Sequence, residues 1–246
     1  MCGRYATSYD PDTLVDAFDV DEVDDDLPGP SWNVAPTDQV PVVMERDSKQ
    51  ADRTVRKLRP LHWGLVPSWA KDPSIGARMI NARVETVAEK PAFRKAFAVR
   101  RCLLPADGYY EWYDTGEKTP KGKAIKQPYF IHPGGDEPMA MAGLYEYWRS
   151  PSQQWYLSCT VITTEATDAL GRIHDRMPMT IARAGWSAWL DPERTDPDDA
   201  AELLEVVEPA RLLSHPVSTE VGSVRNNGPH LVDPIPDPFA LPEDRP

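Results

Sequence analysis

Residues 101–113, with the sequence RCLLPADGYYEWY, are the stretch that decides the fold class. Apolar and aromatic residues dominate this stretch, which is a composition typical of a β-strand. Other stretches rich in β-branched or aromatic residues and bounded by Pro, Gly or polar clusters are 40–44, 54–65, 129–132, 139–148 and 155–163. The sequence therefore predicts a core built mainly from strands.

Short helices are predicted around these strands. Asp10 followed by Pro11, with apolar Leu14, Val15 and Phe18 at helical spacing, predicts a capped helix. Further helices are expected at 91–99, 185–190 and 198–207. Because helices and strands do not alternate regularly, and because 26 of the 246 residues are proline, we predict an α+β fold with an antiparallel barrel or sandwich core flanked by short helices.

The domain organisation is predicted to be simple. We expect one domain over residues 1–234 and a tail rich in proline and acids over residues 235–246. Residues 116–127, rich in Lys, Gly and Pro, predict an exposed hairpin-like loop.

Several classes of protein are disfavoured by composition. No run of 18 apolar residues exists, and the first residues carry no apolar signal region, so we expect a cytoplasmic protein. The three cysteines, Cys2, Cys102 and Cys159, form no CxxC pair, and the five histidines show no HExxH spacing. We therefore expect no disulfide framework, no metal and no cofactor, and we expect a monomer.

The charge is distributed unevenly. The formal net charge is −12, which by itself disfavours binding to nucleic acid. Residues 53–101 nevertheless carry twelve Lys or Arg against three acids, whereas residues 10–26 carry nine acids and no base. The basic central segment is the first indication of a polyanionic partner.

Cys2 has unusual chemistry if the initiator methionine is removed. An N-terminal cysteine carries an α-amine and a thiol on adjacent carbons. The α-amine has a lower pKa than lysine and is the readiest amine nucleophile in the chain. It can attack an aldehyde to form an imine, and the thiol can then close a thiazolidine ring. A small apolar residue at the start of a strand is the structural alternative.

Two motifs in the basic segment predict contact with single-stranded nucleic acid. They are residues 63–69, with Trp63 and Trp69, and residues 81–86, with Asn81 and Arg83. Aromatic rings interleaved with arginines such as Arg94 suit a groove where bases stack and phosphates pair. Core packing of the tryptophans and solvation of the arginines are the alternatives.

Glu111 and His174 are candidates for proton transfer. Glu111 lies within aromatic residues 108–113, where burial would raise its pKa towards neutrality. His174, followed by Asp175 and Arg176, has an imidazole, the side-chain type best suited to transfer protons near pH 7. A cross-strand charge pair for Glu111 and a structural role for His174 remain open alternatives.

The order of the motifs resembles the SRAP family of abasic-site processing proteins, which form covalent links with abasic DNA. The matching residues are 1–4 (MCGR), 32–37 (WNVAPT), 63–69 (WGLVPSW), 81–86 (NARVET), 93–94 with 101–105, 108–112 (GYYEW), 174–178 (HDRMP) and 224–227 (VRNN). The resemblance extends from residue 2 to about residue 234.

The resemblance implies a role for each matched residue. Cys2 would be the nucleophile, Glu111 the acid and base, His174 a second proton-transfer residue, and Asn81 would orient the Cys2 amine. The residues that would contact single-stranded DNA are Arg4, Asn33, Pro36, Trp63, Trp69, Arg83, Arg94, Trp112 and Arg176. It also implies removal of Met1, lyase activity by β-elimination, a strand-rich α+β fold and association with the nucleoid when DNA is bound.

Two other functions remain open at this stage. A class II glutamine amidotransferase would use the Cys2 thiol as an N-terminal nucleophile on glutamine, although such chains normally continue differently after Cys-Gly. A non-catalytic single-strand binding module would need no Cys2 chemistry at all.

Overall fold

The computed structural model describes residues 2–48, 52–135, 137–166, 172–196, 198–200, 202 and 212–236. The strands are β1 (Tyr5–Thr7), β2 (Glu22–Val23), β3 (Ser31–Val34), β4 (Gln39–Ser48), β5 (Arg53–Trp63), β6 (Asn81–Arg83), β7 (Arg101–Ala106), β8 (Gly108–Lys118), β9 (Ala124–Pro133), β10 (Met139–Arg149), β11 (Trp155–Glu165), β12 (Arg176–Pro178) and β13 (Leu212–Pro216). The helices are α1 (Pro11–Phe18), α2 (Arg94–Val99) and α3 (Trp186–Leu190), with 3₁₀ turns η1 (Pro73–Arg78), η2 (Val84–Thr86), η4 (Arg183–Gly185), η5 (Thr219–Gly222) and η6 (Pro229–Leu231).

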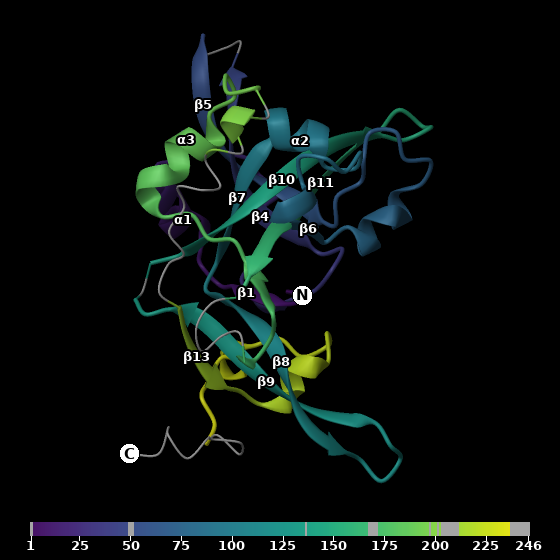
Figure 1. Cartoon of the computed structure of the whole chain (residues 1–246). Coiled ribbons are helices and arrows are strands. Elements are labelled where there is room, and N and C mark those ends of the chain that lie inside the picture. The colour runs from purple at the N-terminus through teal and green to yellow at the C-terminus, as the bar shows by residue number, and fades with distance from the viewer. Residues whose placement is uncertain are drawn as a thin grey trace.

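The strands form two sheets that meet near the N-terminus (Figure 1). The smaller sheet has the order β13-β9-β8-β1-β3, and the larger has the order β12-β11-β10-β7-β4-β5-β2. Parallel pairing of β11 with β5, at Ser158 with His62 and at Cys159 with Trp63, closes strands β5, β4, β7, β10 and β11 into a barrel. Strand β6 pairs with a different segment of β11 from the one that pairs with β5. The predicted α+β fold with a strand-rich core is confirmed.

Residues 101–113 form two strands, where the sequence predicted one. The chain leaves the larger sheet after Ala106 and enters the smaller sheet at Gly108. Asp107 fixes this crossing, because its N–H donates to the Ala6 carbonyl at 2.8 Å and its carboxylate accepts from the Ser8 N–H at 3.0 Å. Gly108 is required there, since a Cβ atom would lie 2.4 Å from the Ile131 carbonyl oxygen.

The helices lie close to their predicted positions. Asp10 caps α1 by accepting a hydrogen bond from the Thr13 N–H at 2.9 Å. Helix α2 begins three residues later than expected and α3 one residue later, and most of the helix predicted at 198–207 lies outside the described residues. The expected loop at 116–127 is the end of a hairpin, in which β8 ends at Lys118 and β9 begins at Ala124. The hairpin projects from the rest of the molecule (Figure 1).

Two apolar cores stabilise the larger sheet from its two faces. The inside of the barrel contains Val42, Met44, Leu104 and Cys159, whereas Val43 and Leu58 face the helices on the outside. Alternation of side chains along each strand produces this division. The barrel thereby holds β11, and with it β6 and β12, in fixed positions.

Arg101 is the buried cation of the helical layer. Its guanidinium donates to the backbone carbonyls of Phe97, Ala98, Trp189, Asp191 and Arg194 at 2.7–3.0 Å. These carbonyls lie at the ends of α2 and α3 and in the segment that follows α3, where helices leave acceptors without partners.

We predict that Arg101→Gln lowers the free energy of unfolding by about 3 kcal/mol, because several buried carbonyls lose a charged donor. Urea unfolding followed by circular dichroism measures the change. Lys95→Gln, at an exposed position of the neighbouring helix α2, is the control and should change stability by less than about 0.5 kcal/mol. Equal stability of the two variants would contradict the capping role of Arg101.

Candidate functional site

The four predicted catalytic residues lie where the two sheets meet. Cys2 precedes β1 and Glu111 is on β8, both in the smaller sheet, whereas Asn81 is on β6 and His174 precedes β12 in the larger sheet. The Asn81 side-chain nitrogen donates to the Cys2 carbonyl oxygen at 2.7 Å and so bridges the sheets. The sequence separates these residues, and the strand pairings bring them together.

Strand β1 determines where Cys2 lies. Tyr5 pairs with Tyr109 and Ala6 with Gly108 in antiparallel register, and the Tyr110 N–H donates to the Arg4 carbonyl at 3.0 Å. Continuing this register towards the N-terminus places Cys2 beside the Glu111 end of β8. The Cys2 side chain is buried, and its Sγ lies 3.7 Å from the Arg4 carbonyl oxygen.

Strand β11 positions the residues of the larger sheet. It pairs on one side with β6, so that Asn81 lies opposite Val161 and Arg83 opposite Thr163, and on the other side with β12, so that Arg176 lies opposite Glu165. Asn81, Arg83 and Arg176 are thus held at the same end of β11.

Burial dominates the electrostatics around Cys2. Glu111 is 3% exposed, and burial raises its pKa above the usual value, while the nearby His174 acts in the opposite direction. Burial also raises the pKa of the Cys2 thiol, and the negative charge of Glu111 adds to that effect. The site therefore favours a protonated thiol and a carboxyl group that exchanges its proton nearer to neutral pH.

The nitrogen and the oxygen of the Asn81 side-chain amide differ in their hydrogen bonding. Its nitrogen binds the Cys2 carbonyl, whereas its side-chain oxygen is buried and accepts no hydrogen bond from the part of the chain that the structure describes. A buried acceptor of this kind is suited to a donor that arrives with substrate or from a processed N-terminus.

His174 lies on the solvent side of the site, with 31% of its side chain exposed. Its Nδ1 accepts a hydrogen bond from the Arg176 N–H at 3.0 Å and lies 2.9 Å from an oxygen of Asp175.

Tyr109 is a site residue that the sequence analysis missed. Its side chain is buried, and burial raises the pKa of its phenol, with further contributions from Cys2 and Glu111. Tyr109 and Glu111 are two residues apart on β8, so strand alternation directs both side chains to the same face. That spacing was the signal available in the sequence.

Arg4 and Asn33 have structural contacts where the resemblance implied contacts with DNA. The Arg4 guanidinium donates to the Asn33 side-chain oxygen at 2.7 Å and to the Val221 carbonyl at 2.8 Å. Asn33 is buried and donates to the carbonyls of Ser223 and Asn226. Both residues attach the segment around η5 to β1 and β3. Their DNA-contact roles stay predictions.

Trp63 and Arg176 are also buried. Trp63 has no exposed surface, and its indole N–H donates to the Ile80 carbonyl at 2.9 Å. Its place in a DNA channel stays a prediction. Trp63 holds the loop that leads into Asn81. Arg176 is 8% exposed, and its guanidinium binds the Glu85 carboxylate and the Thr163 carbonyl. A phosphate could bind Arg176, as predicted, only if it displaced Glu85.

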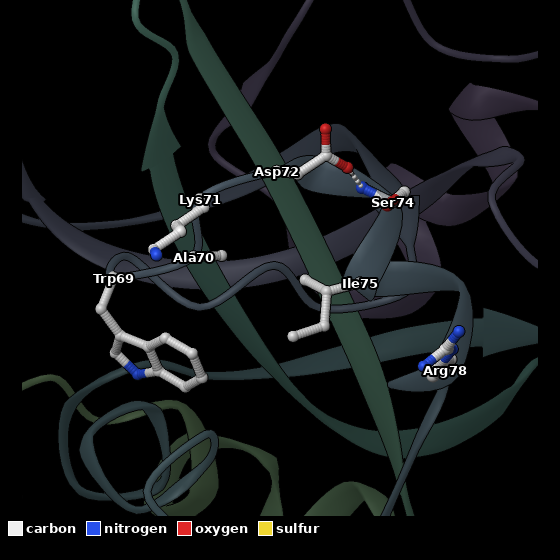
Figure 2. Close-up of a pocket in the computed structure, with 7 residues that line it drawn as sticks. All are labelled: Trp69, Ala70, Lys71, Asp72, Ser74, Ile75 and Arg78. Carbon is white, nitrogen blue, oxygen red and sulfur yellow. Dashed lines mark hydrogen bonds between the residues drawn. The ribbon is translucent and has the colours of Figure 1, made fainter.

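The remaining predicted DNA contacts are more accessible. Arg83 and Arg94 are exposed, Trp112 and Pro36 are partly exposed, and Trp69 is 59% exposed. Figure 2 shows Trp69 and Arg78 on either side of Ile75, in a cleft of about 440 Å³ formed with Ala70, Lys71, Asp72 and Ser74. The DNA-contact roles of these exposed residues stay predictions.

The loop that carries Trp69 is anchored firmly. The Leu65 N–H donates to the Met79 carbonyl at 3.1 Å, and the Trp148 indole donates to the Ala70 carbonyl at 2.8 Å. Gly64 has a φ of +138°, and a Cβ atom on it would lie 2.6 Å from the Gly76 carbonyl oxygen. Only glycine allows this close crossing of the loop ends.

Part of the basic segment is neutralised by the acidic block. Arg53 pairs with Asp21, Lys57 with Glu22 and Arg59 with Asp24, because β2 lies beside β5. Arg56 pairs with Glu45 on β4. The other exposed cations of residues 53–101 are Lys71, Arg78, Arg83, Lys90, Arg94 and Lys95.

The three cysteines are free and buried. Within the described residues, no group of three or more His, Cys, Asp or Glu side chains is arranged to hold a metal ion. No helix in that part of the chain is long and apolar enough to span a membrane.

These features define a class of α+β protein in which a cysteine at position 2 faces a buried carboxyl group between two sheets. A family model described as SOS response associated peptidase (SRAP) matches residues 1–224. The chain belongs to the SRAP family, which agrees with the resemblance and leaves the amidotransferase alternative without support.

Relatives from bacteria and vertebrates are similar over most of the chain. The abasic site processing protein YoqW of Bacillus subtilis (strain 168) is 38% identical over 237 residues, covering 95% of this chain and 99% of the relative. The abasic site processing protein HMCES of Xenopus tropicalis is 31% identical over 272 residues, covering 96% of this chain and 78% of the relative.

Solved structures show the same fold. A protein from Bacteroides thetaiotaomicron, 21% identical, matches with a TM-score of 0.77 and covers 95% of this chain and all of that chain. A phage-related protein from Bordetella bronchiseptica, 30% identical, matches with a TM-score of 0.65 over 88% of this chain and 94% of that chain.

The raised pKa of Glu111 predicts a pH-dependent effect of Glu111→Gln on stability. At about pH 8 the unfolded state holds a solvated carboxylate, so folding must either bury that charge or bind a proton. Near pH 4 the carboxyl group is protonated in the folded state and largely protonated in the unfolded state, and this cost is lost. We therefore expect Glu111→Gln to stabilise the protein relative to wild type at about pH 8, and this advantage to shrink as the pH falls towards 4. Urea unfolding across this range measures it, and a difference independent of pH would contradict the prediction.

Proposed function

We propose that this protein captures abasic sites in single-stranded DNA by forming a thiazolidine between Cys2 and the open-chain sugar. The observation that carries the proposal is the convergence of Cys2, Asn81, Glu111 and His174 from four distant segments. Relatives over nearly the whole chain are named abasic site processing proteins, which supports the same substrate here.

The first step requires a free α-amine on Cys2. Hydrolysis of the peptide bond between Met1 and Cys2 releases methionine, either by the protein itself or by an aminopeptidase. Met1 lies outside the described residues. The buried side-chain oxygen of Asn81, close to the Cys2 backbone, is suited to accept a hydrogen bond from the new amine.

Capture then follows in two bond-forming steps. The neutral amine attacks the C1′ aldehyde, and loss of the aldehyde oxygen as water leaves an imine. The thiol adds to the imine carbon, and its proton passes to the nitrogen, which closes the five-membered ring. Since burial raises the pKa of the Cys2 thiol, the thiol stays protonated and the amine is the first nucleophile. In an amidotransferase, by contrast, the Cys2 thiol would have to be the first nucleophile.

Glu111 and His174 supply the proton transfers. A carboxyl group with a raised pKa can protonate the departing water and then take a proton back. His174 is partly exposed and close enough to Glu111 to lower its pKa, so it is placed to exchange protons with solvent and with the sugar hydroxyl. The imine also permits β-elimination, which would give lyase activity beside capture.

The exposed cations and rings near the site suit a single strand. Arg83 and Arg94 are suited to pair with phosphates, and Trp69, Trp112 and Pro36 offer ring surface to bases. We further propose that the protein acts as a monomer in the cytoplasm, at the nucleoid when DNA is bound. The proposed domain is 1–234, although the Ile235 N–H still donates to the Pro216 carbonyl at 3.0 Å; most of the tail 235–246 lies outside the described residues.

We predict that Cys2→Ala and Cys2→Ser both abolish stable capture, because neither has the thiol that closes the thiazolidine ring. Each keeps the α-amine once Met1 is removed, so each yields an imine that becomes stable only after borohydride reduction. Intact-mass spectrometry before and after incubation with an abasic oligonucleotide reports both the loss of Met1 and the adduct. An unprocessed N-terminus, or no adduct with the wild type, would overturn the proposal. Ammonia release from glutamine under the same conditions would favour the amidotransferase.

We also predict that Glu111→Gln slows capture by about 10²-fold or more, the usual contribution of a general acid or base, without weakening DNA binding. Single-turnover gel assays measure the rate, and fluorescence anisotropy measures binding. Glu117→Gln, at an exposed position on the same strand β8, is the matched control. Equal rates for the two variants would remove Glu111 from the mechanism.

A further inference from the structure

The barrel has a second cleft, distinct from the Cys2 site. Its volume is about 490 Å³, within the range of small-ligand sites. It is lined by Arg46 of β4, Arg59 of β5, Tyr147 of β10, and Trp155 and Leu157 of β11. On β5, Arg59 precedes Trp63 by four residues, which is about 13 Å along the strand. Arg46, on the paired strand β4, lies still further from Trp63 in the same direction. The cleft therefore lies away from the end of the barrel where Trp63 contacts the residue before Asn81.

The cleft holds two guanidinium groups, of which Arg59 is ion-paired with Asp24 and Arg46 has no ion pair within the described residues. The Arg46 side chain donates to the Tyr147 hydroxyl, and no carboxylate in the described part of the chain lies within ion-pair distance of it. Arg59 binds Asp24 through Nε at 2.7 Å, which leaves its two terminal nitrogens without a partner among the described residues. Arg53, Arg56 and Lys57 on the same strand are all ion-paired. In a chain of net charge −12, the uncompensated charge of Arg46, together with the terminal N–H groups of Arg59, favours an anion.

The same cleft presents flat aromatic surface. Trp155 is 61% exposed, although large apolar side chains are usually covered. The Tyr147 ring lies 6.3 Å from the Trp155 ring in an edge-to-face arrangement, and the Arg149 guanidinium lies 5.3 Å from the Trp155 ring centre. These contacts fix the orientation of an indole that contributes little to the core.

We propose that this cleft is a second nucleotide-binding site. The unpaired base would stack on Trp155, and its phosphate would bind Arg46 and Arg59. Exposed rings beside guanidinium groups are the combination with which proteins hold single nucleotides of an unpaired strand. The nucleotide can come from a DNA strand or from the free pool. The inference goes beyond abasic-site capture, because it does not involve Cys2.

Calorimetric titration of the full chain tests the proposal with four probes: deoxythymidine monophosphate, thymidine, inorganic phosphate and an undamaged oligothymidylate. The monophosphate should bind more tightly than thymidine or phosphate alone, because it uses both halves of the cleft. Trp155→Ala and Arg46→Gln should each weaken it about tenfold or more, the loss expected for one base stack or one charged contact. Arg53→Gln, an exposed ion-paired arginine on β5, is the control and should bind as the wild type does.

The two sources of the nucleotide give different results. If the variants weaken both the monophosphate and the oligonucleotide, the cleft accepts free nucleotides as well as strands; if they weaken only the oligonucleotide, the cleft is a strand subsite. The proposal is overturned if no probe binds, if the variants bind like wild type, or if phosphate binds as tightly as the monophosphate. Covalent capture of a short abasic oligonucleotide should be unchanged in Trp155→Ala. Absence of capture in the wild type would refute the proposed function and leave the calorimetric result valid.

Discussion

The hydrogen bond from the Asn81 side chain to the Cys2 carbonyl is the contact on which the arrangement of the site depends. It joins the two sheets at the point where the smaller contributes Cys2 and Glu111 and the larger contributes Asn81, Arg83 and His174. Each partner is supported by strand pairing behind it, β1 on β8 and β6 on β11. Because both sheets are held by extensive cores, the chemistry-bearing residues have fixed positions relative to one another.

The burial of ionisable groups in the same region lowers the stability of the fold. A carboxyl group, a thiol and the Tyr109 phenol are buried close together, and burial raises the pKa of each. Groups of this kind stabilise a structure less than apolar residues of the same size would, and they are typical of functional sites. The fold offsets the cost elsewhere, for example through the five carbonyl contacts of Arg101 and the packing of α1 and α3 on the sheet.

Opposite charges that are far apart in the sequence are partly brought together by the fold. Strand β2 places acidic residues of the N-terminal block against the basic side chains of β5, so a large part of the basic segment is neutralised within the fold. Other cations of the basic segment stay exposed, among them Lys71, Arg78 and Arg83. A protein of strongly negative net charge can thus present a local surface suited to phosphates, while its remaining surface repels polyanions.

Sequence alone determined the local structure and the available chemistry. The apolar and aromatic stretches predicted most of the long strands, Asp10 and Pro11 predicted α1, and Cys2, Glu111 and His174 were identified by what their functional groups can do. Local patterns encode these properties because alternation and capping involve neighbouring residues. The change of sheet at Asp107 and the contacts of Trp63, Asn33, Arg4 and Arg176 were decided by tertiary structure. Those features depend on pairings between residues far apart in the chain, such as Arg4 with Val221, and burial is a property of the assembled fold.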